Sequence, residues 1–159
     1  MHYNFEQDLH EAARTEEQVA QWFSNEGHEV VELNNDYRYD IKVKLKTGNV
    51  VLVEVKEDFM CKKTGNVAVE FQCRGKPSGI DRSEADYYVY KVHTPDDIEL
   101  LAISKEKLMS LVDTKQYHSI KIGGDTGSET KMYLFDIDTI KQNFKSLTTG
   151  DKDETFNNT

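Results

Sequence analysis

From Asp40 to Lys56 the sequence reads D-I-K-V-K-L-K-T-G-N-V-V-L-V-E-V-K, and this stretch decides the fold. Two runs rich in β-forming residues flank a turn at residues 46–49, K-T-G-N, so the pattern predicts a β-hairpin. Asp40 opens the first strand, while Glu54 and Lys56 end the second. Because successive strand residues point to opposite faces of a sheet, Glu54 and Lys56 share one face.

A hairpin across this turn can bring Asp40 beside Glu54 and Lys56. Carboxylate oxygens can hold a hard divalent cation, and an amine next to them can act on a water molecule. The run V-V-L-V before Glu54 is apolar on both faces, which predicts a strand in the centre of the sheet. The stretch therefore indicates a metal site. The alternative is a solvated face carrying cross-strand charge pairs.

A helix is predicted from near Ala12 to Gly27, where the glycine is a stop signal. Val19 and Phe23 lie on one face of this helix, and Glu16 sits in the middle of the same face. A carboxylate on a buried stripe is costly unless it is paired or bound to a metal. Glu16 is therefore either a third acid of the site or a partly exposed residue at the edge of the stripe.

The rest of the chain alternates between strand and helix patterns. Further strands are predicted at residues 28–34, 66–72, 86–92, 99–103 and 131–137, and further helices from Ser104 to about Val112 and from Asp138 to about Leu147. This pattern predicts an α/β fold: a central mixed sheet of about five strands, with the first helix on one face and the C-terminal helices on the other. Residues 1–147 are predicted to form one domain, and residues 148–159 a disordered tail.

The net charge of −9 argues against nonspecific coating of nucleic acid, which requires a basic surface. The charge is uneven, since residues 61–91 hold more basic than acidic side chains. No run of 18 apolar residues is present, so no membrane span is predicted. The N-terminal residues lack a basic start and an apolar core, so no secretory signal is predicted, and a cytoplasmic location is expected.

In the order of its motifs the chain resembles the PD-(D/E)XK nuclease superfamily. The matching residues are Glu16 on a helix, Asp40 at the start of a strand, and Glu54-Val55-Lys56 at the end of the next strand. Tyr39 stands where the family name has proline. The resemblance implies a restriction-endonuclease-like core and a divalent-metal-dependent endonuclease that hydrolyses DNA phosphodiester bonds.

Within the superfamily the chain looks most like Holliday-junction resolvases and small phage endonucleases. The segments that carry this likeness are T-G-N-V-A-V-E-F-Q-C-R-G-K-P-S-G-I at residues 64–80 and A-D-Y-Y-V-Y at residues 85–90. The likeness implies a phage-encoded or bacterial protein whose DNA substrate is branched or otherwise structured. A homodimer is expected for such a substrate, because two symmetric cuts call for two sites.

The residue types then suggest a role for each member of the site. Asp40, Glu54, Glu16 and the backbone carbonyl of Val55 are expected to bind Mg²⁺ or Mn²⁺ through oxygen. Lys56 is expected to orient or deprotonate the attacking water and to stabilise the transition state. These five residues are the predicted catalytic and metal site.

Substrate contacts are predicted in the loop C-R-G-K-P-S-G-I-D-R-S, residues 73–83, which is rich in glycine and basic residues. The predicted DNA contacts are Arg74, Lys76, Ser78 and Arg82. Glu70 and Gln72 are predicted as accessory residues beside the metal, by resemblance to polar residues of the third strand in this superfamily. Tyr87, Tyr88 and Tyr90 are expected to pack within the fold.

Other classes of function stay open on the sequence alone. The acidic balance also suits a non-catalytic binding protein on the same fold, such as a phage or host-factor interactor or a DNA mimic. A nuclease for RNA and a site-specific restriction-type enzyme are further possibilities, because the residues do not separate them from a nuclease for structured DNA.

Overall fold

The computed structural model describes residues 5–34, 36–123, 129–148 and 156, and its strands form two sheets. The helices are α1 (Phe5–Asn25), α2 (Cys61–Thr64), α3 (Lys105–Asp113) and α4 (Ile137–Asn143), with a short 3-10 helix, η1 (Gly79–Asp81). The main sheet has the order β1-β2-β3-β6-β7-β10, and its strands are β1 (Glu29–Leu33), β2 (Ile41–Lys44), β3 (Val50–Asp58), β6 (Tyr87–His93), β7 (Ile98–Ser104) and β10 (Lys145–Ser146). The predicted α/β class with a central mixed sheet is confirmed, and the sheet has six strands where about five were expected.

The predicted hairpin is formed by β2 and β3. The two strands pair antiparallel, from Ile41 opposite Val53 to Lys44 opposite Val50. Gly48 lies in the connecting turn with a φ of 97°, which a residue without Cβ adopts at little cost. The K-T-G-N signal thus marks the turn correctly.

β3 changes its partner along its length. Its first part pairs with β2, and from Val53 to Asp58 it pairs in parallel with β6. The pairing with β2 ends at Val53, whereas β3 runs on to Asp58. Beyond Val53, the edge of β3 on the β2 side therefore has no pairing with β2. This arrangement places β3 in the centre of the sheet, as its apolar run predicted, and opens a notch beside Glu54 and Val55.

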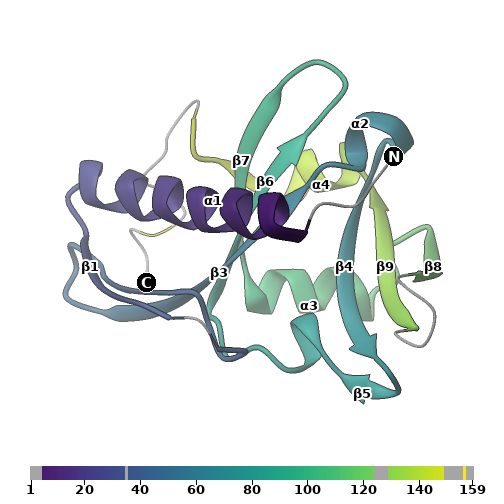
Figure 1. Ribbon diagram of the computed structural model, residues 1–159, viewed down its shortest axis with the longest axis horizontal. Coiled ribbons are helices and arrows are strands. Elements are labelled where there is room, and N and C mark those ends of the chain that lie inside the picture. The colour runs from purple at the N-terminus through teal and green to yellow at the C-terminus, as the bar shows by residue number, and fades with distance from the viewer. Residues whose placement is uncertain (1–4, 35, 124–128, 149–155, 157–159) are drawn as a thin grey trace.

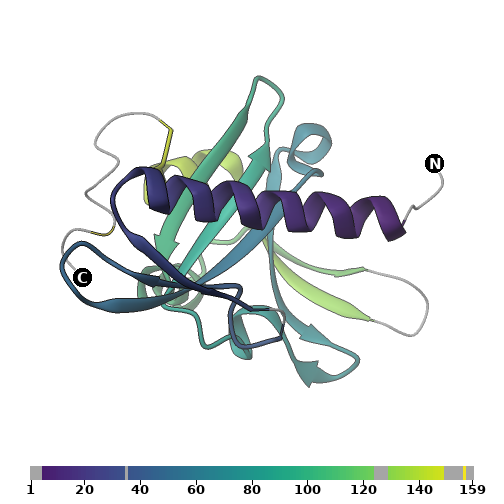
Figure 2. The ribbon, with the colours of Figure 1, turned by 60° about the vertical axis from the view of Figure 1, so that its left-hand side comes forward.

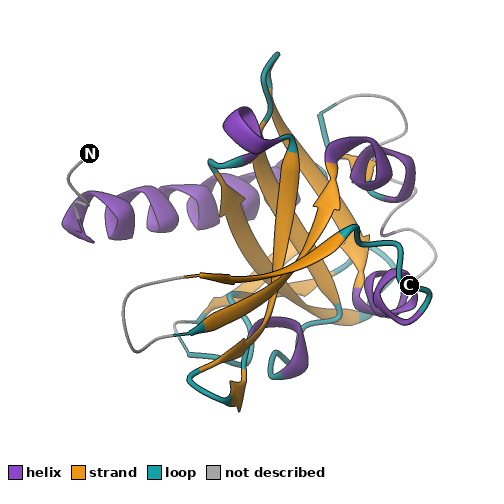
Figure 3. Ribbon diagram, turned by 90° about the vertical axis from the view of Figure 1, so that its right-hand side faces the viewer, coloured by secondary structure: helices purple, strands orange, loops and turns teal. Residues whose placement is uncertain are grey.

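Two apolar layers cover the two faces of the main sheet, and Figure 3 shows α1 on one side of the strands and α3 and α4 on the other. On one face, Val19 and Phe23 of α1 pack with Val53 and Val55 of β3. On the other face, Leu108 of α3 and its neighbours pack against the opposite side of β6 and β7. The predicted placement of the first helix and the C-terminal helices is therefore confirmed. The N-terminal turns of α1 extend beyond the sheet (Figure 2).

The strand expected at residues 66–72 is present as β4, but it lies in a second sheet. This sheet has the order β5-β4-β9-β8, and its strands are β4 (Asn66–Cys73), β5 (Lys76–Pro77), β8 (Ser119–Gly123) and β9 (Thr130–Asp136). Figure 1 shows β4 and β9 standing apart from β3. Part of the predicted loop 73–83 is thus a tight hairpin, in which Arg74 and Gly75 both take positive φ, as a two-residue turn of this kind requires.

The C-terminal part of the chain differs in two details from the expected pattern. Asp136, and not Asp138, caps α4, because its carboxylate accepts a hydrogen bond of 2.9 Å from the backbone N–H of Thr139. The helix ends at Asn143, and the short strand β10 follows. Most of the predicted tail lies outside the described residues, but Phe156 is described and is buried against Trp22 and Phe23. None of the helices in the described residues is long and apolar enough to cross a membrane.

Candidate active site

Asp40 fills the notch beside β3 where the β2 ladder ends. Its backbone N–H donates to the carbonyl of Val53 at 3.0 Å, and its Oδ2 accepts from the N–H of Val55 at 2.7 Å. The side chain thus continues the ladder that β2 leaves incomplete. In a strand the N–H and C=O of one residue point to the same edge, so the Val55 carbonyl also faces this notch.

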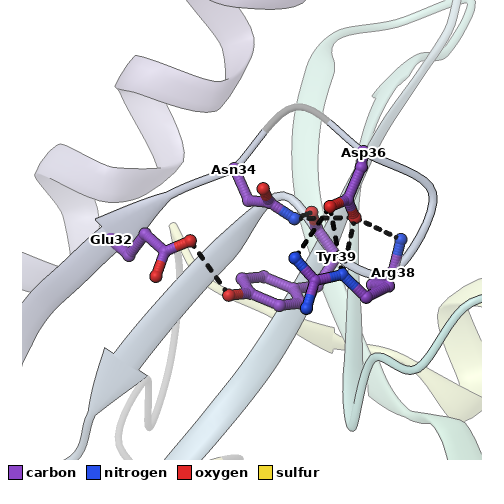
Figure 4. A network of polar contacts seen from close by, with 5 residues as sticks. All are labelled: Glu32, Asn34, Asp36, Arg38 and Tyr39. Carbon is purple, nitrogen blue, oxygen red and sulfur yellow. Dashed lines mark hydrogen bonds and ion pairs between the residues drawn. The ribbon is translucent and has the colours of Figure 1, made fainter.

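The turn before Asp40 is braced by a polar network (Figure 4). The Asp36 carboxylate accepts from the Arg38 guanidinium at 2.7 Å and from the Asn34 amide at 2.9 Å. The hydrogen bonds from Arg38 hold the pKa of Asp36 below its usual value. Asn34 in turn donates through its backbone N–H to the carbonyl of Asp40 at 2.7 Å. The turn therefore fixes the backbone from which the Asp40 carboxylate extends.

Glu54 lies on β3 next to Asp40, and its side chain is buried, with 9% of the residue exposed. The Ser83 hydroxyl donates to Glu54 Oε2 at 2.9 Å. Burial, followed by the hydrogen bond and charge of Asp40, raises the pKa of Glu54 from 4.5 to about 7. The charge of Lys56 and the Ser83 hydroxyl act in the opposite direction.

Glu16 reaches the same place from α1. It is half-buried, while Val19 on the next turn of the helix is fully buried. Burial, followed by the charge and hydrogen bond of Asp40, raises the pKa of Glu16 to about 7, and the charge of Lys56 lowers it. Glu16 therefore contacts Asp40, and both Glu16 and Glu54 lie within reach of the Lys56 charge. The structure brings together the three acids and the lysine that the sequence singled out.

Asp40 is the common member of this acid cluster, since it hydrogen-bonds to both Glu16 and Glu54. Among the described residues, no group of three or more His, Cys, Asp or Glu side chains is arranged so that it could hold a metal ion. The chemistry of the donor set nevertheless suits a hard cation, because carboxylate oxygens are the ligands that Mg²⁺ and Mn²⁺ prefer. Without a cation, protons on these acids reduce the repulsion between their negative charges, and a bound cation would do the same.

Ser83 is a site residue that the sequence reasoning missed. Besides Glu54, its hydroxyl oxygen accepts from the N–H of Ala85 at 3.1 Å and lies 3.2 Å from the carbonyl of Arg38. Ser83 thus connects the loop after η1 with the turn that carries Asp40. A single serine in a polar loop has no sequence signal that marks it, because the contact depends on two loops meeting in space.

The four predicted DNA contacts are divided between three places. The Arg82 guanidinium stacks over the exposed ring of Tyr37 at 3.9 Å from the ring centroid, next to Ser83 and the turn before Asp40. Ser78 is half-buried just before η1. Arg74 and Lys76 are exposed on the β4–β5 hairpin, in the second sheet. Of these four residues, Arg82 is the one directly next to Ser83, whose hydroxyl bonds to Glu54 of the acid cluster.

Glu70 and Gln72, the predicted accessory residues, lie on β4 in the second sheet. Burial is the main cause of the raised pKa of Tyr90, and the charges of Glu54 and Glu70 add to it. A Cβ on Gly79 would collide with the backbone of Glu70, so η1 can pack on β4 only with glycine at this position. The tyrosines Tyr87, Tyr88 and Tyr90 are buried, which confirms that they pack within the fold.

No protein-family model matches the chain, and no curated protein matches it. Solved structures that are similar in part include two nucleases. A bacterial homing endonuclease has a TM-score of 0.48 and 18% sequence identity, covering 62% of this chain and 70% of that chain. A nuclease from a fusselovirus has a TM-score of 0.46 and 12% identity, covering 93% of this chain and 90% of that chain. Similarity at this level does not transfer a function from either protein to this chain.

Proposed function

We propose that this protein is a divalent-metal-dependent nuclease that hydrolyses DNA phosphodiester bonds, with Mg²⁺ or Mn²⁺ as its cofactor. The observation that carries the proposal is the meeting of Glu16, Asp40 and Glu54 beside Lys56, with the pKa of two of these acids raised to about 7. Buried carboxylates this close repel each other unless a proton or a cation is shared between them. Acids with such raised pKa values are typical of catalytic and metal sites.

Asp40, Glu54 and Glu16 would hold the cation, with the Val55 carbonyl as a further oxygen ligand. The N–H of Val55 anchors one oxygen of Asp40, and Ser83 anchors one oxygen of Glu54. Each carboxylate is thus fixed through one oxygen, which leaves the other for the cation. When bound, the cation supplies a Lewis acid for the phosphate and an acidic water.

Lys56 is the proposed catalytic amine. It lies on the same face of β3 as Glu54, and its charge acts on both Glu16 and Glu54. From this position the charged amine can orient the attacking water and stabilise the negative charge that builds up on the phosphate. Arg82 would bind a neighbouring phosphate beside the site, and Arg74 and Lys76 would bind the DNA further along.

The substrate is proposed to be branched or otherwise structured DNA, on the basis of the resemblance to junction-resolving nucleases. A homodimer would supply the two sites that symmetric cutting of two strands requires. A non-catalytic acidic binding protein is the second candidate, and the net charge of −9 favours it. Such a protein would bind a basic partner and would leave DNA uncut.

Incubation with plasmid, linear duplex, single-stranded, flap and four-way-junction DNA in Mg²⁺ or Mn²⁺ tests the proposal. The wild-type protein is expected to cut at least one substrate, and EDTA is expected to stop the reaction. Lys56→Ala is expected to lose about a hundredfold or more of the rate, the usual contribution of a positioned acid–base group. Lys44→Ala is the matched control, because Lys44 is exposed on the same hairpin, opposite Val50 at the far end of β3.

Two results would contradict the nuclease proposal. One is intact DNA on every substrate with either cation at micromolar protein, which would favour the acidic binding protein. The other is equal cleavage by the wild type and by Lys56→Ala, which would indicate a contaminating nuclease.

A further inference from the structure

Glu57 lies on β3 next to the proposed site but faces the other way, and its side chain is 10% exposed. Strand residues alternate between faces, so Glu57 points toward α1, while Lys56 points to the opposite face of the sheet. Its Oε1 accepts a hydrogen bond of 2.6 Å from the Thr15 hydroxyl, and its Oε2 lies 2.7 Å from Nε2 of His93. A partner on each oxygen holds the Glu57 carboxylate in place, and one of those partners, Thr15, belongs to the helix that carries Glu16.

The residues around Glu57 hold it in place from the side of β6. The ring of His93 stacks on the ring of Phe59, with 4.4 Å between the centroids. Lys91 Nζ lies 3.9 Å from Glu57 Oε2 and also donates to Gln18 on α1 at 3.0 Å. Two polar contacts, at Thr15 and at Gln18, therefore tie α1 to the main sheet on either side of Glu16.

The apolar contacts of α1 fix the position of Glu16 less precisely than the polar contacts of Thr15 and Gln18 do. Val19 and Phe23 pack into the core, but apolar packing is not directional and allows a helix to rotate or slide slightly. Thr15, which is only 2% exposed, makes a short directional bond at the residue directly before Glu16. A small rotation of α1 at this point moves the Glu16 carboxylate away from Asp40.

We propose that Glu57 and Thr15 are positioning residues that set where Glu16 lies over Asp40. They act through the helix and do not touch the substrate or the cation themselves. The expected effect of Thr15 and Glu57 on cation binding and DNA cleavage rests on the proposed nuclease function. The placement of Glu16 relative to Asp40 does not rest on it, and the two can be tested separately.

The test compares Thr15→Val, which keeps the shape and removes the hydroxyl, with Thr15→Ser, which keeps the hydroxyl. The first readout is the position of the Glu16 carboxylate relative to Asp40 in crystal structures of the metal-free variants. Thr15→Val is expected to move the Glu16 carboxylate away from Asp40, because the bond that fixes α1 to Glu57 is lost, and Thr15→Ser is expected to leave it in place.

The second readout is Mn²⁺ affinity, measured by calorimetry, together with the cleavage rate. Thr15→Val is expected to weaken Mn²⁺ binding about tenfold, the lower end of the range for residues that orient metal ligands, while Thr15→Ser stays within about twofold of wild type. In a Glu16→Gln background, Thr15→Val should cause no further loss. Should Thr15→Val fail to fold, Thr15→Ala is compared with Thr15→Ser in the same way.

An unchanged position of the Glu16 carboxylate in folded Thr15→Val would overturn the positioning role. An equal loss of Mn²⁺ affinity on adding Thr15→Val with and without Glu16→Gln would also overturn it. If the wild type neither binds Mn²⁺ nor cuts DNA, the nuclease proposal fails, and the crystal structures of the variants still decide whether Thr15 positions Glu16.

Discussion

Two aspartates, Asp40 and Asp86, hold the backbone of β3 in a similar way from opposite edges of the strand. Each directly precedes a strand that pairs with β3. Asp40 bonds to the backbone of Val53 and Val55, and Asp86 bonds to Leu52 through both its N–H at 2.7 Å and its Oδ2 at 2.8 Å. Each thus fills an edge of β3 that its neighbouring strand leaves open.

The difference between the two aspartates lies in their surroundings. Asp86 is exposed, whereas Asp40 is half-buried and hydrogen-bonds to two further acids, Glu16 and Glu54. The same residue, used in the same way by the backbone, therefore becomes a candidate catalytic group only where other charged groups converge on it. Asp86 serves as an internal control for Asp40.

The largest expected effect separates these two aspartates. Asp40→Asn should lower DNA cleavage by at least about a hundredfold, because even residues that only orient metal ligands contribute about 10–100-fold. Asp86→Asn should stay within about twofold of wild type. In both variants the amide oxygen can still accept the backbone hydrogen bond, so both should fold, which thermal melting would verify. An equal loss in the two variants would mean that Asp40 serves only the strand ladder.

The sequence alone could identify one aspartate of this pair and not the other. Asp40 stands out because Glu54 and Lys56 end the next strand, and the hairpin register follows from the K-T-G-N turn and the apolar run. Glu16 could be predicted from its place on the apolar stripe of the helix. The contacts of these residues are local to a hairpin and to the helix that covers it, so residue patterns are sufficient.

The missed features depend on contacts between distant segments. Ser83 meets Glu54 only because two loops pack together, and no local pattern encodes this contact. β4 was predicted as a strand, but its place in a second sheet depends on pairing with β9, about sixty residues later. The contact between Thr15 and Glu57, which are 42 residues apart, likewise cannot be predicted from local periodicity.

A smaller effect on cleavage is expected when Ser83, which bonds to Glu54 beside Asp40, is changed. Ser83→Ala removes the hydroxyl that lowers the pKa of Glu54, so this pKa should rise further above 7. The rise of the cleavage rate with pH should shift to higher pH, and the rate at pH 7 should fall about tenfold. Ser110→Ala, at an exposed position on α3, is the control. An unshifted pH profile in Ser83→Ala would show that Ser83 does not act on Glu54.

The acids around Asp40 should also give the metal-free protein an unusual dependence of stability on pH. Between 4.5 and about 7 the folded protein binds more protons at Glu16 and Glu54 than the unfolded chain does. The free energy of unfolding therefore falls as pH rises through this window. Tm in EDTA should drop by several degrees between pH 5 and pH 8, and Mn²⁺ should restore it at pH 8. A flat profile in EDTA, or the same slope in Glu54→Gln, would contradict this origin.

The smallest expected effect concerns Arg82, which lies near Asp40 and stacks on Tyr37. Arg82→Ala should weaken DNA binding a few-fold and lower the salt dependence by about one released ion, as for a single phosphate contact. Lys62→Ala, an exposed cation on α2, should leave the salt slope unchanged. Binding of catalytically inactive Lys56→Ala protein to fluorescent DNA at several salt concentrations measures both. Identical slopes for the two variants would remove Arg82 from the DNA interface.

The most direct measurement is anomalous diffraction from crystals of the protein soaked in Mn²⁺ near pH 8, where the acids give up their protons. We expect an anomalous peak within coordination distance of Asp40 and Glu54, and no peak in Asp40→Asn crystals treated in the same way. No peak at saturating Mn²⁺ in the wild type, or a peak that persists unchanged in Asp40→Asn, would contradict a cation-dependent nuclease site beside Glu54 on β3.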